Sequence, residues 1–296
     1  MVRPLVRDED ALSTLWSFMG VLIVVIAILG VYYGYVVPKF PAPPLRSQAG
    51  DQVTVDYIGT FEENGLVFDT SLLSVAEDNA SFPKAFSFGW RSSFAPLGPF
   101  AVSGVPLAVI KGFDLGVQGL AVGESRTLVI PPDLGYGPAD PSKFIVKPLL
   151  ESVPVRLTMT PTDFVASYHT AAVSGTQVTD PFWGWTAMVT SAGTLVTVTN
   201  SPTPGQVVHP YGAWDATVVG IDDSADGGVG SISVRHLLVP SQVDRVGERN
   251  AQGAVLFVVS AVDLDAGTYT LNYNVGPPVG RTLVFLVTMI RISRVF

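Results

Sequence analysis

The chain has 296 residues, of which 48% are hydrophobic and only 14% are charged, and its formal net charge is −8. An acidic chain of this kind lacks the basic surface that neutralises nucleic acid phosphates, so we expect no nucleic acid partner. The absence of cysteine excludes disulfides, thiolate metal sites and cysteine nucleophiles. The three histidines, His169, His209 and His236, are far apart in sequence, so we expect no metal and no cofactor.

A long apolar run near the N-terminus indicates a membrane helix. Residues 15–37, LWSFMGVLIVVIAILGVYYGYVV, contain no charged side chain and are long enough to cross the roughly 30 Å hydrocarbon core of a bilayer. Aromatic residues, from Trp16 to Tyr35, lie near both ends, as at membrane interfaces. A signal peptide would have a shorter apolar core and a cleavage site, and a buried helix would show a polar face. We therefore predict a transmembrane helix over residues 15–37, after an N-terminal tail over residues 1–14.

Basic residues on the two sides of this helix are almost balanced. Arg3 and Arg7 precede it and Lys39 and Arg46 follow it, so the positive-inside rule decides little. The short tail favours a cytoplasmic N-terminus, which predicts a single-pass protein of the cell membrane with the bulk of the chain on the extracytoplasmic side. The proline-rich segment 38–48 would then be a stiff linker between the lipid and the folded part.

The segment after this linker predicts a β-sheet with one short helix. Residues 51–61 place Val53, Val55 and Tyr57 on one side, which is typical of a half-buried strand. Residues 109–120 carry apolar side chains at helical spacing, but their glycines indicate a short helix held by tertiary packing. The other expected elements are short strands at residues 85–88 and 125–130, a loop at 92–107 and a long terminal strand at 282–296.

Residues 143–275 have a different texture and predict a second, mostly β domain. Thr160 followed by Pro161 is typical of a helix N-cap with proline at the first helical position. Asp226–Gly227 favours a hairpin turn. The expected strands are at residues 186–190, 194–199, 214–219, 231–238, 254–262 and 268–272.

Aromatic residues are concentrated in this second domain, at Phe182–Trp185, Tyr211 and Trp214. They form either the core of the domain or an apolar surface for unfolded clients. Aromatic side chains dominate protein cores, which favours the first interpretation.

Three fragments of the chain, taken in order, resemble the FKBP-type peptidyl-prolyl cis-trans isomerases. They are VDYIGTFEENGLVFDTS at residues 55–71, VIKGFDLGVQGLAVGESRTLVIPPDLGYGP at 109–138 and GRTLVFLVTMI at 280–290. The family fold is an antiparallel sheet wrapped around one short helix, which agrees with the elements expected above. The resemblance therefore implies a fold class that is mainly β with few short helices (α+β).

The resemblance also divides the predicted isomerase domain into residues 49–142 and 276–296. Between them, residues 143–275 occupy the place where bacterial SlyD-like and archaeal relatives carry a chaperone domain inserted in the flap. The resemblance thus implies a β-rich, chaperone-like insert, larger here than is usual in the family.

The substrate pocket follows from the resemblance, residue by residue. The family's catalytic positions match Tyr57, Phe68, Asp69, Phe113, Tyr136 and Phe285, and its substrate-binding positions match Phe86, Val109 and Ile110. Phe113 would form the floor, where many relatives have tryptophan. Tyr136 would donate a hydrogen bond to the substrate backbone, and Asp69 would orient polar groups at the rim. Any one phenylalanine alone would be interpreted as core packing, but the set favours a pocket.

Together these features predict a membrane-anchored prolyl isomerase that also serves as a chaperone for polypeptides folding at the membrane surface. Its partners would be proline-containing client polypeptides, macrolide-type inhibitors and, through one helix, the lipid bilayer. No cofactor is needed, because no bond is broken when an amide rotates. One alternative is a non-catalytic structural or assembly subunit of a membrane complex that kept the FKBP fold, and another is a small-molecule binding protein that uses the same pocket.

Overall fold

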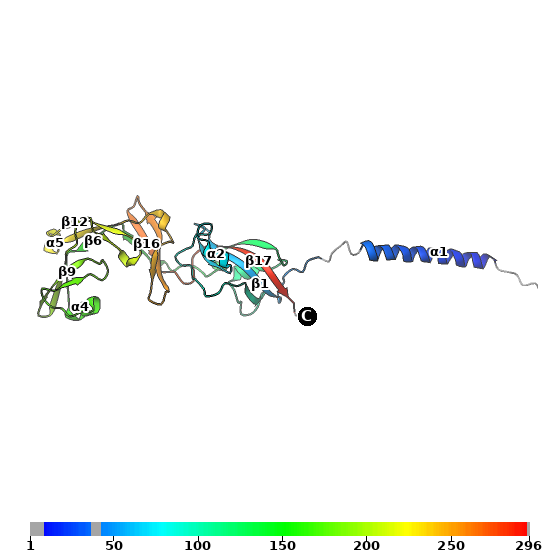
Figure 1. Ribbon diagram of the computed structural model, residues 1–296, viewed down its shortest axis with the longest axis horizontal. Coiled ribbons are helices and arrows are strands. Elements are labelled where there is room, and N and C mark those ends of the chain that lie inside the picture. The colour runs from blue at the N-terminus through cyan, green and yellow to red at the C-terminus, as the bar shows by residue number, and fades with distance from the viewer. Residues whose placement is uncertain (1–8, 37–42, 295–296) are drawn as a thin grey trace, which may run out of the picture. The chain divides into compact units, whose positions relative to one another are not determined.

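The computed structural model describes residues 9–36 and 43–294, which form two separate units (Figure 1). The first is an N-terminal helix, and the second is a compact unit that begins at Arg46. Residues 1–8 of the predicted tail, the last residue of the predicted membrane helix and residues 38–42 of the predicted linker lie outside the described residues. The mainly β fold class is confirmed, because the second unit consists mostly of strands with few short helices.

The N-terminal helix is long and apolar. α1 spans Glu9–Val31 and continues as a wider helical turn over Tyr32–Val36, so residues 9–14 belong to the helix rather than to the predicted tail. The stretch Trp16–Tyr35 has a mean hydropathy of 2.2, and no part of it is buried against protein. By length and composition it qualifies as a membrane span or as a signal sequence.

The second unit contains a five-stranded antiparallel sheet, which is formed by its first four strands and its last strand. β1 (Gln52–Phe61) pairs with the last strand, β17 (Leu283–Ser293), and the strand order is β2-β1-β17-β4 with β3 also paired to β1. Alternate residues of β1 are buried, which confirms the predicted half-buried strand. The other strands are β2 (Val67–Thr70), β3 (Leu97–Ala101) and β4 (Ser125–Ile130), and the helical turns nearby are α2 (Leu73–Glu77), η3 (Pro132–Leu134) and η4 (Pro141–Lys143).

Helix α3 (Lys111–Val117) packs closely on this sheet because two of its residues are glycines. A Cβ atom at Gly112 or Gly116 would lie 2.5 or 2.4 Å from side chains of β4, so only glycine allows the helix to approach this strand. The helix contributes Phe113 and Val117 to the core beneath the sheet. The prediction of a short helix held by tertiary packing is confirmed, and its glycines have a packing role.

The compact unit begins earlier than predicted. The predicted linker runs to residue 48, but the guanidinium of Arg46 donates to Glu124 over 2.7 Å, and its backbone bridges to Ala121. Ser47 is buried, and its hydroxyl donates to the carbonyl of Val117 over 2.6 Å. The chain is therefore fixed to the second unit from Arg46 onward.

Two predictions for the segment before α3 are wrong. Residues 85–88 form no strand, because the pairing of this stretch is limited to one bridge between Lys84 and Val67. Conversely, β3 lies within the predicted loop 92–107 and pairs with β1. This strand was not predicted because it contains glycine and proline, which are depleted in strands and usually indicate loops.

Between η4 and β17 the chain builds three four-stranded antiparallel sheets, each with its own hydrophobic core. Their strand orders are β7-β10-β9-β8, β11-β12-β13-β6 and β14-β15-β16-β5. The strands are β5 (Phe144–Pro148), β6 (Leu150–Pro154), β7 (Arg156–Met159), β8 (Gln177–Thr179), β9 (Thr186–Ala192), β10 (Leu195–Asn200), β11 (Val207–Val208), β12 (Ala216–Asp222), β13 (Ser231–His236), β14 (Gly247–Arg249), β15 (Val255–Asp263) and β16 (Thr268–Asn272). The helical elements are α4 (Pro161–Tyr168), η5 (Pro210–Gly212), α5 (Ala225–Gly228) and η6 (Pro240–Gln242).

Most local predictions for this part of the chain are confirmed. Each of the six predicted strands overlaps an observed one, and the helix α4 begins after Thr160, whose hydroxyl accepts a hydrogen bond from the backbone N–H of Asp163 over 3.1 Å. Asp226 and Gly227 have positive φ angles of 52° and 67° in the turn between β12 and β13. Six strands, β5, β6, β7, β8, β11 and β14, were not predicted.

The aromatic residues of this part are mostly core, as the first interpretation predicted. Trp183, Trp185 and Trp214 are at most 7% exposed. The exception is Phe182, which stays 38% exposed.

Several sets of hydrogen bonds join residues 143–275 to the rest of the unit. We call these residues the inserted segment, because they lie in sequence between the strands β4 and β17 of the five-stranded sheet. At its neck, the backbone N–H of Asp140 donates to the Asn274 side chain over 3.0 Å, and Asn274 Nδ2 donates back to the carbonyl of Asp140 over 3.1 Å. These hydrogen bonds hold together the two points at which the chain enters and leaves the inserted segment.

Another set centres on Asp244, whose side chain is 5% exposed. Arg281 donates to both of its carboxylate oxygens, over 3.1 and 2.8 Å, and Asn64 Nδ2 donates over 2.7 Å. Arg281 also pairs with Glu63. We call these four residues the Asp244 clasp, because they connect the inserted segment to the residues just before β17 and to the turn after β1.

Candidate active site

A cavity of about 390 Å³ opens between the five-stranded sheet and α3. Eight of the nine sequence-predicted site residues line it, together with three that were not predicted. The strands β1, β2, β3 and β17, helix α3 with the residues just before it, the segment after η3 and the loop that holds Arg91 contribute these side chains. The lining residues are Tyr57, Phe68, Asp69, Arg91, Leu97, Ala108, Val109, Ile110, Phe113, Tyr136 and Phe285.

Aromatic rings form the apolar part of the cavity. Phe285 meets Phe113 and Phe68 edge to face, with ring centroids 5.2 and 5.6 Å apart. Tyr57 meets Phe113 in the same manner at 6.1 Å. Phe113 is only 3% exposed, so the ring at the base of the cavity is fixed by the core behind it. Edge-to-face pairs at these distances are favourable, and they hold the cavity walls in place.

A glycine on β1 allows two of these rings to meet. A Cβ atom at Gly59 would lie 2.8 Å from Phe285 Cε1 and 2.9 Å from Phe68 Cζ. Both distances are shorter than carbon atoms tolerate, so the absence of a side chain here lets Phe68 and Phe285 pack over the strand.

We expect the substitution Gly59→Ala to displace the two rings and to destabilise the fold by about 1–3 kcal/mol, as added methyl groups do in a filled core. Thermal and denaturant unfolding would measure this loss. The matched control is Gly220→Ala, because Gly220 also lies in a strand and a Cβ atom there would meet no other atom within 4 Å. Equal stability of the two variants would contradict the packing role of Gly59.

A polar group of three residues, Tyr57, Asp69 and Arg91, also lines the cavity. The hydroxyl of Tyr57 donates to Asp69 Oδ2 over 2.7 Å. Arg91 Nη2 donates to the same hydroxyl over 3.1 Å and forms an ion pair with Asp69. The carboxylate is thus held from two sides, and we call this group the Tyr57–Asp69–Arg91 network.

Burial raises the pKa of Tyr57 far above its ordinary value, and the negative charge of Asp69 adds to this rise. Burial and, less strongly, Asp69 also raise the pKa of Tyr136. Both hydroxyls therefore keep their protons at neutral pH. They differ in their partners: Tyr57 already donates to Asp69, whereas among the described residues no hydrogen-bond partner is found for the Tyr136 hydroxyl, which is free to donate to a bound molecule.

Phe86 does not line the cavity, contrary to the prediction. Its ring lies under the guanidinium of Arg249, 5.0 Å from the ring centroid, and a Cβ atom at Gly247 would lie 2.9 Å from it. Its backbone N–H donates to the carbonyl of Asp244 over 2.7 Å. Phe86 thus packs against the inserted segment rather than against a substrate.

Arg91, Leu97 and Ala108 were missed by the sequence analysis. Arg91 offered one signal, because it is the only charged residue between Lys84 and Lys111 and lies in a stretch rich in glycine, proline and serine. A single cation in such a segment needs an anionic partner when the segment folds over a cavity. Leu97 offered no signal, since the strand β3 that carries it was predicted as a loop.

A second cavity of about 340 Å³ adjoins the first and shares Phe68, Asp69, Arg91 and Tyr136 with it. Its other walls are Trp90 and the returning segment at Val275–Pro278. The four shared residues therefore line both cavities. The first cavity lies against the five-stranded sheet, and the second is bordered by the end of the inserted segment. Within the described parts of the chain, no group of three or more His, Asp or Glu side chains could hold a metal ion.

Comparison with known proteins identifies the same region. A model of the FKBP-type peptidyl-prolyl cis-trans isomerase family matches residues 98–149, which include α3, β4 and Tyr136. Similar curated proteins include FK506-binding protein 2 of Candida glabrata, which is 33% identical over 131 residues, and the short-type peptidyl-prolyl cis-trans isomerase of Methanocaldococcus jannaschii, which is 38% identical over 91 residues.

These alignments cover 43% and 31% of this chain, and 80% and 51% of the two relatives. A peptidyl-prolyl cis-trans isomerase of Arabidopsis thaliana, FKBP53, is 36% identical over 92 residues, which is 31% of this chain and 14% of that protein. Apart from the Candida protein, the chain therefore matches about half or less of the length of these relatives.

Proposed function

We propose that this chain, which belongs to the FKBP-type peptidyl-prolyl cis-trans isomerase family, catalyses rotation about Xaa-Pro peptide bonds in the cavity lined by Tyr57, Asp69 and Phe113. The observation that carries the proposal is the combination of a fixed aromatic floor, a Tyr57–Asp69–Arg91 network and a Tyr136 hydroxyl free to donate. The substrates would be proline-containing polypeptides, and macrolide-type inhibitors would occupy the same cavity.

The chemistry requires no bond to break. Amide conjugation opposes rotation with a barrier of roughly 18–20 kcal/mol, and both isomers of an Xaa-Pro bond are accessible. An apolar cavity favours the twisted amide over the more dipolar planar one, and the rings around Phe113 would hold the proline ring. Tyr136 would donate to the substrate backbone, and the Tyr57–Asp69–Arg91 network supplies fixed dipoles that need no reorganisation during rotation.

The test is a protease-free isomerase assay on the full chain in phosphatidylcholine nanodiscs, in which a labelled Xaa-Pro peptide relaxes after a solvent jump. We expect relaxation faster than the uncatalysed exchange of tens to hundreds of seconds and suppression by a macrolide. A folded chain that leaves the peptide at its background rate would instead support the structural-subunit alternative.

We further propose that α1 anchors the protein in the cell membrane. Its apolar stretch, uncovered over Trp16–Tyr35, supports this. We expect the intact chain to remain in membranes washed with alkaline carbonate, and mass spectrometry of the mature protein to find the N-terminal segment still attached. A soluble product that lacks the segment would show that the helix is a cleaved signal sequence.

The bulk of the chain would face the extracytoplasmic side. Because the chain has no cysteine, a single Ala266→Cys substitution in an exposed turn gives a unique label site. A membrane-impermeant maleimide should label it in intact cells as fully as in permeabilised cells. Labelling only after permeabilisation would place the domain in the cytoplasm.

For the inserted segment we propose a chaperone-like role, in which residues 143–275 hold client polypeptides while residues 49–142 and 276–296 form the isomerase domain. The Asp244 clasp and the neck at Asp140 and Asn274 support a concerted action, because they fix the segment next to the catalytic sheet. The second cavity, bordered by Trp90 and Val275–Pro278, also adjoins the end of this segment.

A further inference from the structure

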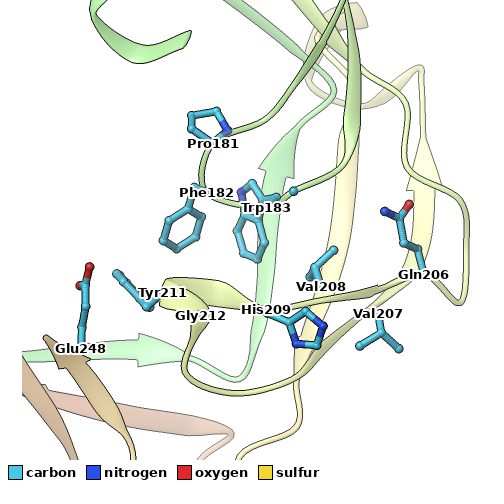
Figure 2. Close-up of a pocket in the computed structure, with 11 residues that line it drawn as sticks. Pro181, Phe182, Trp183, Gln206, Val207, Val208, His209, Tyr211, Gly212 and Glu248 are labelled. Atoms are coloured by element: carbon cyan, nitrogen blue, oxygen red, sulfur yellow. The ribbon is translucent and has the colours of Figure 1, made fainter. Parts of the chain in front are cut away.

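The inserted segment contains a cavity of about 440 Å³ that none of the catalytic features explains (Figure 2). One wall is the loop between β8 and β9, with Phe182 and Trp183, and the opposite wall is β11 and the turn η5 that follows it. Glu248 on β14 closes one end. The cavity thus lies where the loop between β8 and β9 meets the sheet that contains β11 and the sheet that contains β14.

Aromatic rings form one end of this cavity. Phe182 meets Tyr211 and Trp183 edge to face, each with ring centroids 4.8 Å apart. Trp183 and Tyr211 are anchored in the cores of the two sheets, whereas Phe182 is 38% exposed. Tyr211 has a φ of 56°, a conformation that bulky residues rarely adopt, so its ring is held at this place at a backbone cost.

The same end carries a carboxylate without a cation. Figure 2 shows Glu248 beside Tyr211, and its negative charge contributes to the raised pKa of that tyrosine, after burial and two other neighbours. Glu248 is half-buried, yet within residues 43–294 its carboxylate forms no ion pair and no side-chain hydrogen bond. The nearby His209 is already paired with Asp215 over 2.9 Å. A half-buried carboxylate next to aromatic rings is the environment that stabilises a cationic side chain.

The other end of the cavity is an edge strand. β11 pairs with β12 on one side only, and its residues Val207 and Val208 border the cavity together with Gln206. An edge strand presents backbone groups to which an extended chain can add. This favours a polypeptide over a compact small molecule as the occupant.

From this arrangement we propose that the cavity binds an extended polypeptide segment, with a lysine or arginine side chain placed between Phe182, Tyr211 and the carboxylate of Glu248. The proposal rests on the client-holding role proposed above and gives it a substrate class, namely unfolded segments in which basic residues alternate with apolar ones. The net charge of −8 also favours cationic segments at longer range.

The test uses the full chain in phosphatidylcholine nanodiscs and a fluorescein-labelled, proline-free peptide in which lysine alternates with leucine. The absence of proline keeps the peptide out of the catalytic cavity. We expect Glu248→Gln to weaken binding about two- to fivefold, the size of one partly exposed ion pair, because the contact of the cation with the rings of Phe182 and Tyr211 remains. Asp265→Asn is the matched control, because Asp265 is an exposed acid in the turn between β15 and β16.

A second peptide, with glutamine in place of lysine, completes a double-mutant cycle between Glu248 and the lysine side chains. It should bind the wild-type chain more weakly and should not distinguish Glu248→Gln from wild type. Phe182→Ala should weaken both peptides, whereas Leu264→Ala, which removes another exposed apolar side chain, should weaken neither. Equal effects of Glu248→Gln and Asp265→Asn would overturn the proposal, since they would indicate general attraction by an acidic protein.

Isomerase activity toward a short Xaa-Pro peptide, measured on the same variants, separates the two proposals. We expect it to be unchanged in Glu248→Gln. Isomerase activity without Glu248-dependent binding would refute the proposed peptide site but not the catalytic function. Glu248-dependent binding in a chain without isomerase activity would support the peptide site and refute the proposed catalytic function.

Discussion

Replacing Asp69 with alanine is expected to lower the kcat/KM of prolyl isomerisation by about ten- to a hundredfold. The carboxylate accepts the hydrogen bond of Tyr57 and pairs with Arg91, so its removal leaves the buried Tyr57 hydroxyl without its acceptor and Arg91 without its anionic partner. A buried polar group without its partner costs about 1–3 kcal/mol, and each 1.36 kcal/mol corresponds to tenfold in rate. The measurement is the protease-free assay with the full chain in nanodiscs.

The control for this prediction is Asp133→Ala. Asp133 is an exposed acid three residues before Tyr136 and does not line the cavity, so its removal changes the net charge without touching the network. We expect it to retain the wild-type rate. If Asp69→Ala retains it as well, the Tyr57–Asp69–Arg91 network is structural and the catalytic groups lie elsewhere in the cavity.

The second large effect concerns stability. We expect Asp244→Ala to lower the free energy of unfolding by about 3 kcal/mol, the lower end of the range for removing one partner of a buried ion pair, because Arg281 keeps Glu63 as a neighbour. Asn64 loses its acceptor at the same time. Chemical denaturation measures the loss, and amide hydrogen exchange should increase at the turn after β1.

Two further variants isolate the cause. Asp223→Ala removes an exposed carboxylate of the inserted segment and should leave stability unchanged within error. The double variant Asp244→Ala, Arg281→Met should recover part of the loss, because it removes the guanidinium left without its main partner. A double variant that is less stable than Asp244→Ala would show that Arg281 contributes mainly through its stacking over Phe61, 4.0 Å from the ring centroid.

The sequence predicted the elements whose pattern is set by burial. β1 alternates in polarity because one of its faces lies in the core, and α4 begins where a threonine cap meets a proline. The cavity residues on β1, β2, α3 and β17 were found by resemblance, because their segments keep the order of the family. The structure brings all of these together in one cavity.

The prediction was incomplete where tertiary contacts decide. Phe86 was assigned to the pocket from its sequence position, but Arg249 and Gly247 of the inserted segment draw it away. Arg91 reaches the cavity from a loop, and a loop has no periodic sequence pattern from which its path could be predicted. The edge strand β11 has only two residues, Val207 and Val208, which is too short for any alternation to be seen.

The position of β17 has a consequence for the order of events during synthesis. This strand lies between β1 and β4, and it pairs Ser293 with Gln52. A ribosome therefore releases the whole inserted segment before the sheet beneath the cavity receives its central strand. Phe285, one wall of the cavity, arrives with that strand. Because pairing over such a sequence distance is slow, we expect the three sheets of residues 143–275, and with them the proposed client-binding site, to form before the proposed isomerase cavity is complete.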